Sequence, residues 1–144
     1  MDDQQKQLQG MLLQLESGKR RLEGLGQQNQ MMQQAQQEIE ATIKALEELE
    51  KIKEGAEVLV PLGAGSYVKA QLKEKEEIIV GVGAGVSIEK KRLEAISALN
   101  SRQKQLSEKQ QKMQQTMQQL STQLNALNAQ AEKLMQQINP EGER

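Results

Sequence analysis

The sequence of 144 residues contains no cysteine, histidine, tryptophan or phenylalanine, and it has a single tyrosine. Without cysteine or histidine, the chain has no thiolate nucleophile, no disulfide and no imidazole base, and it lacks the usual ligands of zinc. We therefore expect no catalytic, cofactor-binding or metal-binding residues, and an enzyme is the least favoured class of function. The scarcity of aromatic side chains also argues against a thick globular core, because aromatic residues supply much of the area that such cores bury.

An excess of charge of either sign is also missing, because 19 basic residues stand against 20 acidic ones and the net charge is -1. Binding to nucleic acid or to an anionic membrane usually requires a basic surface, so we expect neither partner. No apolar run approaches the about 18 residues of a membrane-spanning helix, and the start, MDDQQKQLQG, does not resemble a secretory signal. These features predict a cytoplasmic protein.

The apolar residues that are present form two ladders in steps of three and four, which is the spacing of one face of a helix. The first ladder predicts a helix over residues 2–54 that ends at Gly55. Its members are Leu8, Met11, Leu15, Leu22, Leu25, Met32, Ile39, Ile43 and Leu46. The second ladder predicts a helix over residues 89–139, with Ser87 as its N-cap. Its members are Ile96, Leu99, Leu106, Met113, Met117, Leu120, Leu124, Leu127, Ala131, Leu134 and Ile138.

Two ladders of similar length on either side of a short segment predict an antiparallel pair of helices with a coiled-coil seam. Each helix would be about 75 Å long at a rise of about 1.5 Å per residue. One register brings Leu46 opposite Leu99 and also matches the far ends of the two ladders. In that register Gln36 faces Gln110, and we expect this polar pair to fix the alignment of the helices.

The segment between the helices, residues 55–88, changes in character and carries Gly-Ala-Gly twice. Valine, isoleucine and tyrosine cluster on both sides of each Gly-Ala-Gly, which indicates strands joined by tight turns. We expect one β-hairpin over residues 57–72 with its turn at 63–65, and a second over residues 77–87 with its turn at 83–85. Glycine would supply the positive φ angles of these turns.

Glycine-rich loops also bind nucleotides, but neither Gly-Ala-Gly fits that use. A dinucleotide fingerprint needs G-x-G-x-x-G before a helix, and a phosphate loop needs Gly-Lys followed by Ser or Thr. Neither pattern occurs in this chain. We therefore favour the alternative, in which the glycines form the turns of β-hairpins.

The predicted hairpins are too apolar to remain in water, and isolated hairpins leave strand edges unpaired. We expect them to join strands of other subunits in a closed sheet, with Pro61 at an edge or a bulge because it has no amide donor. The residues expected to form this oligomerisation surface are Val58, Val60, Leu62, Val68, Ile78, Ile79, Val80, Val82 and Val86.

The central sequences EVLVPLGAGSYVKAQL and EEIIVGVGAGVSIEK, placed between two coiled-coil helices, resemble those of alpha-class prefoldin subunits. The resemblance implies an α+β fold, in which a long antiparallel coiled-coil hairpin carries two central β-hairpins that form an oligomeric β-barrel. Residues 1–144 would then be one subunit. The resemblance also implies a hexamer of two alpha and four beta subunits. This hexamer would hold unfolded proteins without ATP and deliver them to a group II chaperonin.

Both chain ends would lie at the tip of the coiled coil, and that tip has more apolar residues than a seam of about two per heptad can use. We expect the tip to bind unfolded clients through Leu8, Met11, Leu12, Leu13, Leu15, Leu134, Met135 and Ile138. Two alternatives stay open. The tip could be an ordinary helix end with scattered apolar residues, and the whole chain could be a structural coiled coil that forms a scaffold or filament.

Overall fold

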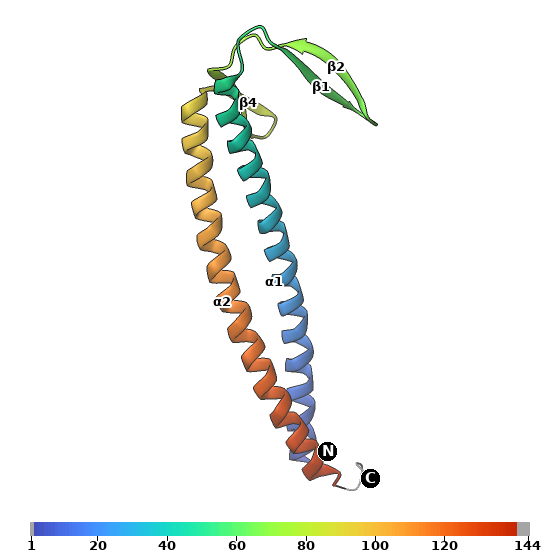
Figure 1. Ribbon diagram of the computed structural model, residues 1–144. Helices are drawn as coiled ribbons and strands as arrows, with labels where there is room; N and C mark the ends of the chain where they lie inside the picture. The colour runs from blue at the N-terminus through green and yellow to red at the C-terminus, as the bar shows by residue number, and fades with distance from the viewer. Residues whose placement is uncertain (1, 141–144) are drawn as a thin grey trace. The chain divides into compact units, whose positions relative to one another are not determined.

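The computed structural model describes residues 2–140 and shows two long helices with two β-hairpins between them (Figure 1). This is the expected α+β architecture. The elements in chain order are α1 (Asp3–Glu48), the 3₁₀ turn η1 (Leu49–Lys51), β1 (Glu57–Gly63), β2 (Ser66–Gln71), β3 (Glu77–Gly83), β4 (Val86–Lys91) and α2 (Arg92–Ile138).

The chain divides into two units, and both helices contribute to each. Unit 1 comprises residues 1–34 and 107–144, and unit 2 comprises residues 35–106 with both hairpins. We describe each unit by itself.

The helix ends differ from the prediction. Helix α1 ends at Glu48, six residues before the expected end at residue 54, because the chain tightens into η1 and then becomes extended at Ile52. Helix α2 begins at Arg92, and Ser87 is not its N-cap. Ser87 instead pairs with Gly81 in the second hairpin. The polar residues after Ser87, which we interpreted as a first helical turn, complete the pairing of β4 with the whole length of β3.

Both predicted apolar ladders are confirmed, because every member is buried or half-buried. In unit 1 the most buried side chains are Leu15, Ala131 and Leu134. In unit 2 they are Ile39, Leu46 and Ala95, of which Ala95 was not in the predicted ladder. The seam is thin in both units, since none of the side chains of residues 2–140 is completely enclosed.

The helices run antiparallel in both units, but the predicted polar pair does not form. In unit 1 the side-chain amide of Gln110 donates to Asn29 Oδ1 at 3.3 Å. In unit 2 the side-chain amide of Gln103 donates to the backbone oxygen of Gln36 at 3.2 Å. Each glutamine therefore has a partner seven residues away from the predicted one. A seven-residue repeat keeps polar positions in phase after such a shift, so periodicity alone does not choose between the pairings.

A glycine interrupts the first ladder at position 18, and the structure gives the reason. A Cβ at Gly18 would overlap the side chain of Leu124, which fills that space in the seam of unit 1. The absence of a side chain on one helix thus lets a large side chain of the other approach the backbone.

The two hairpins share one geometry. Strand β1 pairs with β2, and β3 with β4, each antiparallel and each with an irregularity just before the turn. In the first turn Ala64 has φ 50° and Gly65 has φ 75°, and the equivalent alanine and glycine of the second turn have φ 52° and 75°. Positive φ at both central residues is the mark of a type I′ turn. The prediction of tight turns is confirmed, although alanine shares the positive φ that we assigned to glycine alone.

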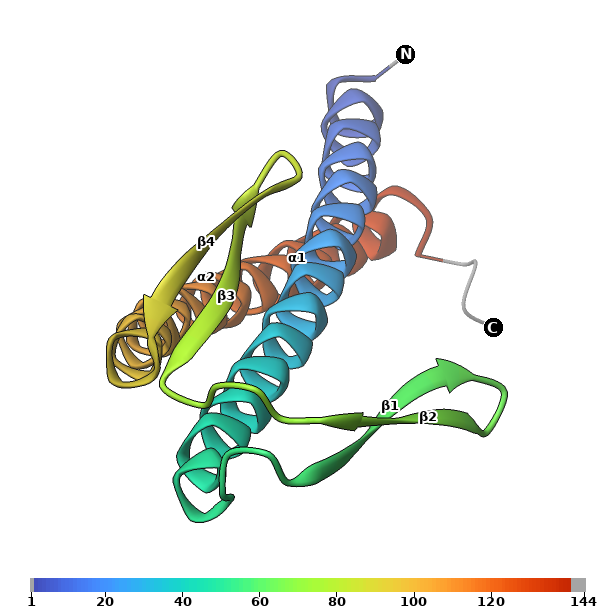
Figure 2. The ribbon, with the colours of Figure 1, turned by 90° about the horizontal axis from the view of Figure 1, so that it is seen from above.

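The hairpins are oriented differently within unit 2. Hairpin β3–β4 lies alongside the helices of this unit, whereas hairpin β1–β2 points away from them (Figure 2). The backbone between the hairpins is anchored beside the start of the first one, because the N–H of Leu72 donates to the carbonyl oxygen of Ala56 at 2.9 Å.

Arg92 joins the ends of both helices in unit 2 and is only 4% exposed. Its Nη1 donates to the backbone oxygen of Leu46 at 3.1 Å. That oxygen lies in the last turn of α1, where carbonyl groups lack helical donors. The guanidinium also lies 3.4 Å from a carboxylate oxygen of Glu76 and 3.9 Å from one of Glu50. Both carboxylates are largely exposed, so these ion pairs contribute little to stability. The buried hydrogen bond and the packing of the Arg92 side chain contribute most of the stability that this residue provides.

We expect Arg92→Met to lower the free energy of unfolding of the purified chain by about 2 kcal/mol, the cost of losing a buried hydrogen bond to a charged donor. Methionine retains the apolar stem, so packing is largely preserved. Denaturant unfolding followed by circular dichroism would measure the change. Lys91→Met, at the exposed neighbouring position, is the control, and an equal effect of both substitutions would contradict the role assigned to Arg92.

Candidate functional site

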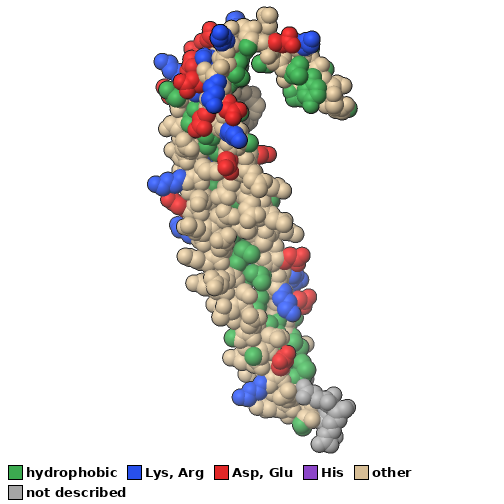
Figure 3. Space-filling model, viewed as in Figure 1, with side chains coloured by type: hydrophobic (Ala, Val, Ile, Leu, Met, Phe, Trp, Pro, Cys, Tyr) green, Lys and Arg blue, Asp and Glu red, His purple; other side chains and the backbone are tan. Residues whose placement is uncertain are grey.

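The hairpins present the largest group of exposed apolar side chains in unit 2, and those of hairpin β1–β2 form a prominent patch in Figure 3. We call this group the hairpin surface. It consists of Leu59, Val60, Leu62, Tyr67, Val68, Ile79, Val82, Val86 and Ile88. Such a concentration of exposed apolar residues marks an interaction site, because water contact with all of them is costly.

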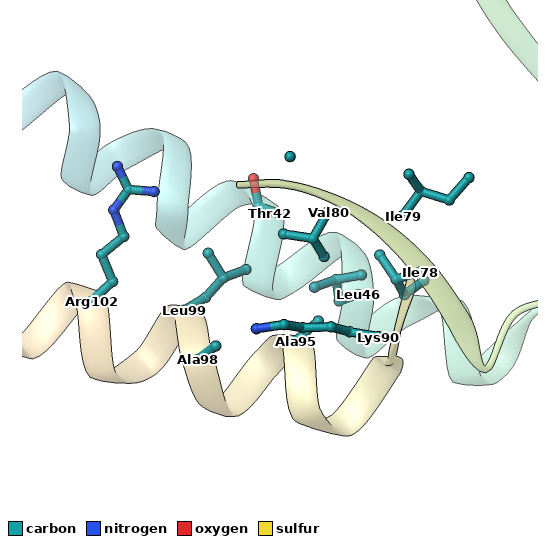
Figure 4. A pocket seen from close by; sticks show the side chains of 11 residues that line it. Thr42, Leu46, Ile78, Ile79, Val80, Lys90, Ala95, Ala98, Leu99 and Arg102 are labelled. Atoms are coloured by element: carbon teal, nitrogen blue, oxygen red, sulfur yellow. The ribbon is translucent and has the colours of Figure 1, made fainter. Parts of the chain in front are cut away.

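Six of the residues predicted for oligomerisation belong to the hairpin surface, and three do not. Val58, Ile78 and Val80 are half-buried in the single subunit. Ile78 and Val80 point toward the helices and line a hollow of about 320 Å³ together with Leu46 and Leu99, while Ile79 points away (Figure 4). Residues 78–80 were predicted to form one surface, but alternation along β3 places Ile79 on the face opposite to Ile78 and Val80.

Sequence reasoning missed three members of the hairpin surface, Leu59, Tyr67 and Ile88. Cross-strand pairing is a signal for Tyr67, which lies opposite Pro61 on the face of the hairpin that carries Leu59. It is no signal for Ile88, which lies opposite the half-buried Val80 and so shares the face of β3 that turns toward the helices. Both hairpins also have unpaired outer edges, because within residues 2–140 each sheet has two strands.

The second candidate surface lies in unit 1, where the start of α1 and the end of α2 lie together. Met11 of α1 and Leu134 of α2 line one hollow of about 320 Å³ there. Beside it, Leu12, Leu13 and Met135 have exposed fractions of 45%, 62% and 46%. We call these three residues the terminal surface.

The other five residues predicted for client binding are not part of the terminal surface. Leu15 and Leu134 are buried, with exposed fractions of 5% and 9%, so they belong to the seam between the helices. Leu8, Met11 and Ile138 are half-buried at its margin. The prediction counted seam and surplus residues together, although all five of these residues belong to the apolar ladders that the spacing assigns to the seam.

Among residues 2–140, no group of three acidic, cysteine or histidine side chains is arranged to hold a metal ion. Over the same residues, neither helix combines the length and apolar character needed to cross a membrane.

Comparison with known proteins agrees with this architecture. The family model for the prefoldin subunit matches residues 18–137. A prefoldin subunit alpha of Methanosarcina acetivorans is 33% identical over 118 residues, which cover 80% of this chain and 83% of the relative. A prefoldin subunit alpha of Thermofilum pendens is 33% identical over 86 residues, covering 60% of this chain and 67% of the relative.

Solved structures show the same fold. A filamentous PFD from Methanocaldococcus jannaschii superposes with a TM-score of 0.71 at 23% identity, covering 80% of this chain and 95% of the other. The prefoldin beta subunit from Thermococcus strain KS-1 gives a TM-score of 0.56 at 24% identity, covering 88% and 90%. Together with the two paired helices, the two hairpins and the match over most of the sequence, these likenesses show that the chain belongs to the prefoldin family and is similar to its alpha subunits.

Proposed function

We propose that this chain is the alpha-class subunit of a chaperone that holds unfolded proteins without ATP. The observation that carries the proposal is the terminal surface, where Leu12, Leu13 and Met135 remain exposed while Leu15 and Leu134 beside them are buried in the seam. Leucine and methionine side chains adapt to partners of varied shape, as a protein that holds many clients requires. The prefoldin family, to which the chain belongs, is a family of chaperones and supports this reading.

In the proposed mechanism each terminal surface makes only weak apolar contacts with a client. Several such surfaces on one assembly would bind the same client together, and linked weak contacts give a high effective affinity. A client that folds withdraws its apolar segments and is released, so nucleotide hydrolysis is not needed. The proposal also includes delivery of the client to a group II chaperonin in the cytoplasm. This step is supported only by the membership of the chain in the prefoldin family.

The hairpin surface supports a separate role in assembly with beta-class subunits. Its exposed apolar residues and unpaired edges suit the walls of a β-barrel formed by several subunits, and two alpha with four beta subunits would close it. One of the similar structures is described as filamentous, and a scaffold or filament is the alternative assembly. Closed rings have a fixed mass, whereas filaments do not.

The direct test measures aggregation of a chemically denatured client after dilution into buffer with the purified assembly and without nucleotide. We expect suppression of light scattering at a stoichiometric ratio of assembly to client, with the native mass of the assembly recorded on the same sample. Unchanged client aggregation in the presence of a closed assembly would overturn the chaperone proposal. Growth of particles without a limiting mass would instead favour the filament.

A further inference from the structure

The hollow of about 320 Å³ in unit 2 lies between hairpin β3–β4 and the two helices (Figure 4). We call it the hairpin hollow. Most of its wall is aliphatic, with Leu46 from α1, Ile78 and Val80 from β3, and Leu99 from α2. Sites for small molecules are typically apolar hollows with a few polar groups, and this one has a volume at the lower end of their range.

Two cationic side chains also line the hairpin hollow, whereas the described residues that line it include no acidic one. Lys90 extends along the hollow from β4, with its ammonium group directed toward the end where Leu99 lies (Figure 4). Arg102 lies beyond Leu99 at the same end (Figure 4). Thr42, the third polar side chain, already donates its hydroxyl to the backbone oxygen of Glu38 at 2.8 Å. The free polar groups of the hollow are therefore positively charged donors.

Neither cation has a counterion within the described part of the chain. Among residues 2–140, Lys90 and Arg102 form no ion pair and no side-chain hydrogen bond. Arg92 in the same unit differs, because it has two carboxylates and a carbonyl oxygen as partners. Lys90 is half-buried. A charge beside apolar walls is costly unless a group of opposite charge accompanies it, so the hollow favours an anionic ligand.

The first hairpin shows that the strand pairing itself does not require a lysine at this position. The two hairpins are repeats displaced by 20 residues, and the equivalent of Lys90 opposite Ile78 is Ala70 opposite Val58. Hairpin β1–β2 points away from the helices (Figure 2). The lysine therefore occurs in the hairpin that lies against the helices and forms one wall of the hollow.

We propose that the hairpin hollow binds a medium-chain fatty acid, with the alkyl chain against the aliphatic walls and the carboxylate at Lys90 and Arg102. An alkyl chain needs no hydrogen-bond partner, and a carboxylate accepts hydrogen bonds from the ammonium and guanidinium groups that are free. The small volume favours a medium chain over a long one. The site belongs to unit 2, whereas the terminal surface belongs to unit 1, so fatty-acid binding does not depend on client holding.

Calorimetric titration of the purified full-length chain with saturated fatty acids from hexanoate to tetradecanoate, each below its micelle concentration, tests the proposal. We expect one site per chain and an affinity that rises about four-fold with each added methylene group until the hollow is filled. Longer acids should then bind no more tightly. Absence of saturable binding would overturn the proposal. An affinity that rises through the longest acid would overturn it too, because exposed apolar surfaces would bind in that way.

Octanoate and octanol have the same chain length and separate the charge from the apolar contact. Lys90→Gln and Arg102→Gln should each weaken octanoate binding about ten-fold and leave octanol binding nearly unchanged. Lys91→Gln and Lys104→Gln remove a charge at exposed positions and should have little effect on either ligand. Equal weakening of both ligands by Lys90→Gln would show that the lysine stem only packs against the walls, and the carboxylate site would be refuted.

A steric variant tests the position of the alkyl chain. Ala98 is exposed and lines the hairpin hollow from α2. Leucine forms helices nearly as readily as alanine, so Ala98→Leu should keep the helical circular dichroism of the wild type while its side chain fills the hollow and abolishes octanoate binding. Ala41→Leu adds the same side chain at an exposed position of α1 outside the hollow and is the control. Unchanged octanoate binding by a folded Ala98→Leu chain would contradict the proposal.

The same titration on the assembly with a beta-class subunit shows whether the hollow remains a ligand site after assembly. We expect one bound octanoate per copy of this chain. Release of octanoate on addition of the beta-class subunit would show that the hollow belongs to the subunit interface, and it would overturn the proposal. Suppression of client aggregation by the Lys90→Gln assembly should equal that of the wild type, so the fatty-acid site and the chaperone function can fail separately.

Discussion

Replacement of Ile79 by lysine is expected to leave a folded subunit that no longer assembles. The Ile79 side chain is 74% exposed and points away from the helices in the single chain, so lysine meets water there and the fold is preserved. Once a second subunit covers that face, the ammonium group would lie in an apolar contact without a partner. Burial of an unpaired charge costs far more than one apolar contact gives, so the expected loss of assembly is complete.

Native mass spectrometry of the variant, alone and with a beta-class subunit, measures this effect. Met31→Lys is the matched control, because Met31 is also an exposed apolar residue, with an exposed fraction of 69%, but lies on α1 in unit 1. It should assemble normally. A normal assembly from Ile79→Lys would show that this face of the hairpin stays in water.

Val80, the next residue along β3, is not suited to the same substitution. From the sequence, Ile79 and Val80 were equally good sites for a charge that blocks assembly. In the structure Val80 faces the helices of unit 2 beside Leu46, so lysine there would disturb the subunit itself. Loss of assembly from a Val80 variant would therefore not separate misfolding from a blocked interface, whereas loss from an Ile79 variant does.

The sequence predicted those parts of the fold that depend on local chemistry. The ladders are a direct consequence of helical periodicity, and the turns follow from Gly-Ala-Gly between apolar strands. The helix ends were less predictable, because they depend on contacts between distant segments. Helix α2 starts only at Arg92 because β4 first pairs with all of β3, and Arg92 then bonds the last turn of α1.

The register of the helices was also beyond the sequence alone. A seven-residue repeat admits several alignments, and Asn29 and Gln36 are equally acceptable polar partners for a facing glutamine. Near the start of α1, the four apolar residues Met11, Leu12, Leu13 and Leu15 lie within five positions. The ladder spacing assigns Met11 and Leu15 to the seam. The structure agrees, because Leu15 is buried whereas Leu12 and Leu13 are exposed.

This separation allows client binding to be tested without damage to the coiled coil. The triple variant Leu12→Gln, Leu13→Gln and Met135→Gln removes the terminal surface but leaves Leu15 and Leu134 in the seam. Glutamine forms helices about as readily as leucine, so the helices should persist. We expect the assembly to keep its native mass and thermal stability and to lose most of its ability to suppress aggregation of a denatured client.

Two controls make the outcome specific to the terminal surface. Met31→Gln removes an exposed apolar side chain elsewhere in unit 1 and should leave client holding unchanged. Leu134→Gln places an amide in the seam and should lower the free energy of unfolding by about 2–5 kcal/mol, through lost packing and an unsatisfied polar group. If the triple variant holds clients as well as the wild type, the exposed residues at the chain ends are not the client surface. If only Leu134→Gln loses client holding, the activity depends on the integrity of the helix pair instead.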